Sequence, residues 1–224
     1  MKPACLWILF SFGIVCQGCS QANTNNEEFT KKGITGVGGN CEGCEAIYES
    51  RLPFKNLQPT DTLPDFFKPG PKIVISGTIY KADGHTPAKD VVLYIYHTDQ
   101  SGKYTPGKNA AGWERRHGAL RGWIKTDQNG FYRFYTLVPA SYPNSRNPKH
   151  IHPVIKESGI NEYYIDEFLF ADDPLLPADE QSKLNPRGGN GVLKTYVKNG
   201  VLHATRDIIL GLNIPGYPKG LIKQ

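Results

Sequence analysis

The chain has 224 residues, of which 39% are hydrophobic and 21% are charged, and its formal net charge is +5. This composition is ordinary for a globular protein, and the length suits one domain with its own hydrophobic core. Lys and Arg do not cluster with interleaved aromatic residues, which argues against a nucleic-acid partner.

Residues 1–18 have the pattern of an export signal. Lys2 supplies a positive start, and the apolar run from Leu6 to Val15 is too short to span a bilayer as a stable helix. Gly18 and Cys19 then precede a polar run, as in a bacterial lipoprotein signal. We therefore predict an exported chain that a lipid on Cys19 anchors to a bacterial membrane, facing the periplasm or the cell surface. The alternative is an ordinary secretory peptide with an incidental cysteine.

Residues 19–40 are polar and Gly-rich and are predicted to form a tether, followed by an N-terminal extension over 41–71. The extension contains Cys41 and Cys44 in the pattern C-E-G-C. Such a pair can be a zinc half-site, a redox pair or a small disulfide. A structural zinc site would need a second pair, which the sequence lacks. Because disulfides persist in exported proteins, a disulfide is the default prediction, with a redox pair as the alternative.

From residue 72 onward the sequence consists of short β-branched or alternating runs separated by turn signals. This pattern predicts an all-β sandwich domain over 72–224. Asn199 and Gly200 lie between two such runs and predict a hairpin. The expected strands cover residues 72–80, 91–96, 123–126, 131–136, 151–155, 163–170, 192–197 and 202–210.

The strand expected at 151–155 begins beside two histidines, His150 and His152. Side chains two residues apart on a strand point to the same side, so the two imidazoles should lie together. Neutral imidazole is the commonest protein ligand for transition metals, although an exposed or hydrogen-bonded pair is an alternative. The remaining histidines have no partner in the pattern and are expected to be surface or packing residues: His85, His97, His117 and His203.

Four segments occur in an order typical of one enzyme family: Gly102-Lys103-Tyr104, Ala140-Ser141-Tyr142-Pro143, Lys149-His150-Ile151-His152 and Phe168-Leu169-Phe170-Ala171-Asp172-Asp173-Pro174. With them, residues 72 to about 177 resemble the intradiol ring-cleavage dioxygenases. The resemblance implies a transthyretin-like β-sandwich in which long loops carry a metal site. It also implies cleavage of a catechol-type diol with O₂ to a muconate-type product. Without these segments, the same runs resemble a non-catalytic transthyretin-like binding or structural module, which is the alternative function.

The resemblance implies one non-haem Fe(III) ion held by Tyr104, Tyr142, His150 and His152. Fe(III) is a hard, highly charged ion that favours anionic oxygen donors and lowers the pKa of a phenol it binds. By analogy, Tyr142 would be both a ligand and the acid–base group. The implied partners are a small aromatic diol and O₂. A homo-oligomer is compatible with the sequence.

Three positions concern the substrate. Arg146 is the nearest candidate for the arginine that polarises bound substrate in protocatechuate enzymes, and it is displaced by one residue. Arg121 corresponds to an arginine of the catechol enzymes, and we expect it near the pocket. Glu167 stands where a glutamine is expected and would repel an anionic substrate. The sequence therefore favours a neutral diol.

Overall fold

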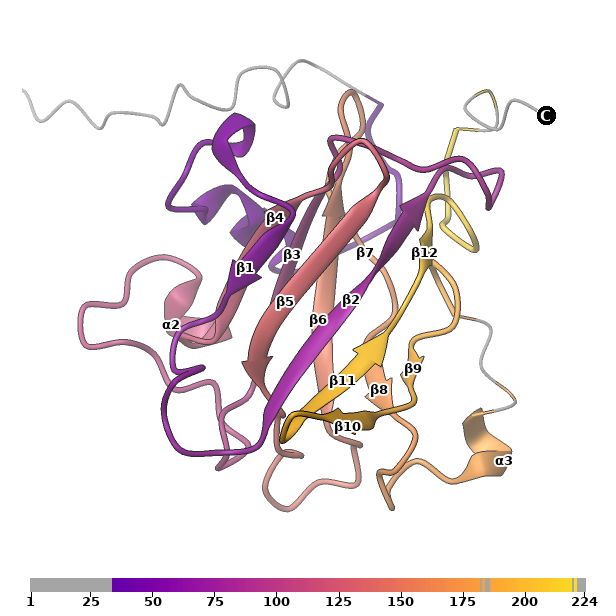
Figure 1. Ribbon diagram of the computed structural model, residues 1–224. Coiled ribbons are helices and arrows are strands. Elements are labelled where there is room, and N and C mark those ends of the chain that lie inside the picture. Colours follow the sequence, from indigo (N-terminus) through magenta and orange to yellow (C-terminus); the bar gives the residue numbers. More distant parts are fainter. Residues whose placement is uncertain (1–33, 182, 184–185, 219, 221–224) are drawn as a thin grey trace, which may run out of the picture.

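The computed structural model describes residues 34–181, 183, 186–218 and 220 (Figure 1). The predicted export signal, Cys19 and most of the predicted tether lie outside the described residues. Within the described ranges, no helix has the length and apolar character needed to cross a bilayer.

The described residues form two six-stranded sheets that pack face to face, which confirms the predicted all-β sandwich. The first sheet has the order β1–β5–β2–β11–β10, with β12 also paired to β2, and it lies toward the viewer in Figure 1. Its strands are β1 (Thr60–Thr62), β2 (Lys72–Tyr80), β5 (Phe131–Leu137), β10 (Tyr196–Lys198), β11 (Val201–Thr205) and β12 (Ile208–Ile209).

The second sheet has the order β4–β3–β6–β8–β9, with β7 also paired to β6. Its strands are β3 (Val92–His97), β4 (Arg121–Lys125), β6 (His150–Lys156), β7 (Tyr163–Tyr164), β8 (Phe168–Phe170) and β9 (Val192–Leu193). The helices are short: the 3₁₀ helices η2 (Cys44–Glu49) and η3 (Phe54–Asn56), and the α-helices α2 (Glu114–His117) and α3 (Ala178–Gln181).

Strand alternation builds the core between the sheets. Leu93 and Ile95 of β3 point inward, and they pack in one cluster with residues of β2 such as Ile73 and Ile75. The side chain between them in β3, that of Tyr94, points to the opposite face of the second sheet. There it packs in a second apolar cluster to which η2 contributes Cys44, Ala46 and Ile47.

The N-terminal boundaries differ from the prediction. The tether predicted over 19–40 already packs at its end, because Val37 is fully buried and its amide donates to the Asn161 side chain. The extension predicted over 41–71 is part of the sandwich: β1 pairs in parallel with β5, and η2 covers the second sheet. The polar composition of these segments did not predict either contact, because each contact is made with a residue far away in the sequence.

Most predicted strands are present, but two of them are divided. Residues 163–170 split into β7 and β8, which pair with different parts of β6. Between them the Ile165 amide donates to the Pro153 carbonyl, but Pro153 has no amide hydrogen to return a hydrogen bond. Residues 192–197 split because β9 joins the second sheet and β10 joins the first. The predicted hairpin is confirmed, with Tyr196 opposite His203.

Candidate metal centre

Four side chains converge at one end of β6. The hydroxyl of Tyr104 lies 2.5 Å from the hydroxyl of Tyr142 and 2.8 Å from Nε2 of His152. The Tyr142 hydroxyl lies 3.0 Å from Nε2 of His150 and 3.3 Å from Nε2 of His152. The two Nε2 atoms are 3.1 Å apart. We call these four atoms the donor cluster.

The positions of the two histidines follow from the strand. His150 and His152 stand two residues apart on β6 and therefore point to the same side of the second sheet. His152 lies opposite Tyr96 of β3, which in turn lies opposite Arg121 of β4.

Tyr104 reaches the donor cluster from the loop that follows β3. The carboxylate of Asp99 organises this loop by accepting hydrogen bonds from Ser101 and Lys103 amides and from the Thr105 hydroxyl. Gly102 has a left-handed φ of 75°, and a Cβ there would lie 2.1 Å from the carbonyl oxygen of Ser141. The glycine therefore allows the Tyr104 loop to approach the segment that carries Tyr142.

The outer nitrogens of the two imidazoles indicate which way their lone pairs point. Nδ1 of His150 lies 2.6 Å from the carbonyl oxygen of Pro148, and a carbonyl only accepts, so this Nδ1 carries the proton. When the ring carries this one proton, its lone pair is on Nε2, inside the donor cluster. Nδ1 of His152 faces the Glu167 carboxylate at 3.6 Å. A metal-ligating histidine commonly has such a carbonyl or carboxylate behind it.

A count of protons shows that hydrogen bonds alone do not account for the donor cluster. The four atoms make five short contacts, whereas the two phenols supply one proton each and His152 at most one more. At least two contacts therefore bring lone pairs together, which is repulsive without a cation between them. Ligands at about 2.1 Å from a transition-metal ion lie roughly 3 Å apart, which is the spacing found here.

Burial sets the charge state of these groups in the absence of a cation. It raises the pKa of Tyr104, and the hydrogen bond with Tyr142 adds to the effect. Burial also raises the pKa of Tyr142 and lowers the pKa of His152 to about 3. All three groups are then neutral near pH 7. A bound cation would reverse the preference of the phenols, because it stabilises the phenolate.

The tyrosines are essential to any metal site at this place. Among the described residues, His, Cys, Asp and Glu side chains form no group of three or more suited to a metal ion. The donor cluster combines two imidazoles with two phenols, a set suited to a hard and highly charged metal ion.

Comparison with known proteins identifies the family of the chain. The sequence profile of the dioxygenase family matches residues 48–187. The chain is 27% identical over 116 residues to the protocatechuate 3,4-dioxygenase beta chain of Burkholderia cepacia, and 26% identical over 151 residues to catechol 1,2-dioxygenase 2 of Acinetobacter lwoffii. The chain belongs to the intradiol dioxygenase family.

The matches cover only part of each protein. The alignment with the Burkholderia protein spans 49% of each chain, and that with the Acinetobacter protein spans 54% of this chain and 53% of the relative. The chain thus spans about half the length of the curated relatives it matches. Catechol 1,2-dioxygenase from Pseudomonas arvilla C-1 superimposes with a TM-score of 0.52 and 21% identity, covering 68% of this chain and 56% of that one. This likeness supports the intradiol fold.

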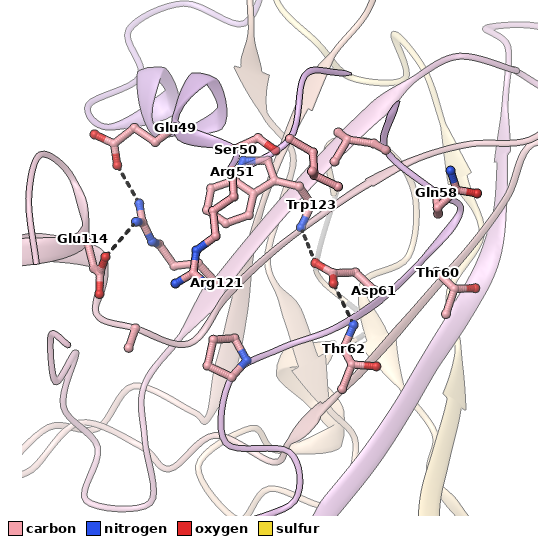
Figure 2. Close-up of a pocket in the computed structure, with 14 residues that line it drawn as sticks. Glu49, Ser50, Arg51, Gln58, Thr60, Asp61, Thr62, Glu114, Arg121 and Trp123 are labelled. Atoms are coloured by element: carbon pink, nitrogen blue, oxygen red, sulfur yellow. Dashed lines mark hydrogen bonds and ion pairs between the residues drawn. The ribbon is translucent and has the colours of Figure 1, made fainter. Parts of the chain in front are cut away.

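The structure shows the surroundings of the two arginines that the family resemblance suggested for substrate binding. The Arg121 guanidinium contacts Glu49 at 2.7 Å and Glu114 at 3.5 Å, and its side chain is only 9% exposed (Figure 2). It lines a separate cavity of about 660 Å³, together with Asp61 and Trp123. Arg146 is exposed, and within the described part of the chain no hydrogen bond or ion pair joins it to the four donor residues.

Glu167 lies beside the centre. It lies behind His152, on the Nδ1 side of the ring, and its side chain is 45% exposed. Its carboxylate is therefore not buried, and water screens part of its field.

Sequence reasoning missed two aromatic neighbours of the donor cluster. The Tyr96 ring stacks on His152, with centroids 4.6 Å apart, and His117 stacks on the other face of Tyr96 at 3.8 Å. His117 is buried, and its Nδ1 bonds to the Tyr94 hydroxyl at 2.8 Å. It is thus a packing residue, as expected, but one packed against the centre. The register of β3 with β6 would have revealed Tyr96; nothing in the sequence around His117 signals its role.

Proposed function

We propose that the chain binds one non-haem Fe(III) ion at Tyr104, Tyr142, His150 and His152 and cleaves a catechol-type diol with O₂. The donor cluster carries this proposal. Its five contacts exceed the protons available, and two phenolates would offset most of the charge of a ferric ion. Membership of the intradiol family supports the same reaction.

Bound ferric iron would hold both oxygens of the diol and activate the ring toward O₂. The chain's own residues then supply positioning and proton transfer. His150 and His152 are fixed from behind by the Pro148 carbonyl and the Glu167 carboxylate, so they hold the geometry. Tyr142 is half-buried, on the loop segment before β6, and its phenolate oxygen would accept a proton from the diol.

Oxygen consumption with catechol tests the proposal. We expect Tyr142→Phe to lower the rate by about a hundredfold or more, because the phenyl ring keeps the packing but loses the base and the oxygen donor. Tyr196→Phe is the matched control, since Tyr196 lies exposed on β10 in the other sheet. A wild-type chain that takes up no oxygen with any diol while holding iron would favour the non-catalytic module instead.

We also propose that the chain is exported and lipid-anchored through Cys19, a residue outside the described part of the structure. The Cys41–Cys44 disulfide is compatible with an oxidising compartment. Mass spectrometry of the membrane-associated protein should show acyl chains on Cys19, and Cys19→Ala should release the chain from the membrane. Acylation absent from a correctly exported chain would leave an ordinary secretory signal.

A further inference from the structure

A cavity of about 220 Å³ opens beside the donor cluster, on the Nδ1 side of His152. We call it the disulfide-side cavity. One wall is the loop closed by the Cys41–Cys44 disulfide, and the other is formed by β6 and residues 164–167. Its lining includes Cys41, Glu42, Tyr96, His152, Tyr164 and Glu167.

A row of stacked aromatic rings connects the disulfide loop with the metal centre. Gly43 lies so close to His117 that a Cβ there would be 2.8 Å from Nε2 of that ring. His117 stacks on Tyr96, and Tyr96 stacks on His152. The His152 and Tyr96 rings line the disulfide-side cavity, and both pack against the donor cluster: His152 supplies Nε2 to it and Tyr96 contacts the Tyr104 ring. A charged substituent on the ring of a diol bound at the cluster would therefore lie within about one Debye length of the charges that line this cavity, so these charges would attract or repel it.

The charges that line this cavity have one sign. Two carboxylates, Glu42 and Glu167, line it, and its lining includes neither Lys nor Arg. Glu42 is paired with Arg116 at 2.7 Å, which offsets its charge. Glu167 contacts His152, and among the described residues it forms an ion pair with neither a lysine nor an arginine. The unpaired negative charge at the centre is thus that of Glu167.

Two basic side chains of the second sheet and its loops are already engaged by carboxylates. Arg121 is held between Glu49 and Glu114, and Lys149 contacts Asp172 at 3.2 Å. An anionic group in the disulfide-side cavity would meet the Glu167 carboxylate, whereas the lining itself supplies neither a lysine nor an arginine.

We propose that Glu167 makes this centre select catechols whose ring substituent is neutral or positively charged, and reject those that carry a carboxylate. The inference rests on the proposed function, since it takes the diol to bind at the donor cluster. Two unit charges roughly 7 Å apart in a half-exposed site change a binding constant by roughly tenfold. We therefore expect a cationic catechol to bind at least tenfold more tightly than its carboxylate counterpart.

Equilibrium binding under nitrogen tests the selectivity without turnover. The iron-loaded full-length chain is titrated by calorimetry with three probes: catechol, an aminoethyl-substituted catechol and a carboxylate-substituted catechol. Glu167→Gln should reduce the preference for the amine over the carboxylate to about threefold or less. Glu45→Gln removes an exposed charge from η2, the 3₁₀ helix that begins at the disulfide loop, and should leave the preference unchanged. High salt should weaken the wild-type preference.

Each outcome decides a specific point. Equal or tighter binding of the carboxylate probe by the wild type would overturn the inference, and so would an unchanged preference in Glu167→Gln. In both cases tight binding of unsubstituted catechol would leave the proposed function standing. If unsubstituted catechol itself fails to bind to the iron-loaded chain, the proposed function fails and the inference fails with it.

Discussion

At the scale of single residues, the protein keeps several imidazoles neutral by burying them. Burial lowers the pKa of His117 and of His97 to about 4. His97 in β3 is 1% exposed; its Nδ1 donates to the Thr98 carbonyl at 2.7 Å, and its Nε2 lies 2.7 Å from the Thr136 hydroxyl. A neutral ring with one donor and one acceptor matches these partners.

This burial predicts a pH dependence of stability. The folded pKa of His97, about 4, is below the unfolded value of about 6.5, so the unfolded state binds more protons between these values. The contribution of His97, about 3 kcal/mol, is present above pH 6.5 and lost as the pH falls to about 4.

We expect His97→Gln to reduce the slope of unfolding free energy against pH by up to about 1.4 kcal/mol per pH unit in that window. Urea unfolding at a series of pH values measures the slope. An unchanged slope in the variant would mean that His97 is not the group that resists protonation. The variant should also lose some stability at pH 7, because the ring packing and the bond to Thr136 change.

At the scale of elements, loops as well as strands position the centre. β6 places the two imidazoles, whereas the phenols come from the segments after β3 and after β5. The close approach of these two segments depends on Gly102, whose missing side chain leaves room for the Ser141 carbonyl.

We predict that Gly102→Ala lowers both stability and metal content. The methyl group would meet the Ser141 carbonyl and would also strain a left-handed backbone, so unfolding free energy should fall by about 2 kcal/mol or more. Separation of the two loops should move Tyr104 away from Tyr142. Thermal unfolding and iron content of the same samples measure the two effects.

Gly159→Ala is the matched control for this prediction. Gly159 has nearly the same φ, 74°, but no heavy atom lies within 4 Å of its hypothetical Cβ. It should therefore show the backbone strain alone and keep its iron. Equal iron loss in both variants would show that the contact between Gly102 and Ser141 does not hold the loops together.

At the scale of the whole molecule, local pattern predicted the strands and a family resemblance predicted the donors. The apolar run at 72–80 is a strand with those bounds, and Asn199-Gly200 joins β10 to β11. The convergence of Tyr104 and Tyr142 on His150 and His152 could not follow from spacing, because it depends on how distant loops fold.

The remaining differences arise where a residue's role is set by a partner far along the chain. Val37 belongs to the core because its amide donates to the Asn161 side chain and its side chain packs in the cluster between the sheets. The Arg121 guanidinium is held by Glu49, a residue 72 positions earlier. Neither partner can be recognised from local composition, so the sequence did not predict either contact.

Two phenols and two imidazoles are proposed to hold a ferric ion, and the visible spectrum of the purified chain, with iron quantified on the same sample, tests this most directly. We expect a coloured protein with about one iron per chain, because tyrosinate bound to Fe(III) gives a charge-transfer band. The band should shift when catechol is added and should weaken in Tyr104→Phe. A folded chain that stays colourless after reconstitution with iron would show that these four residues hold no ferric ion.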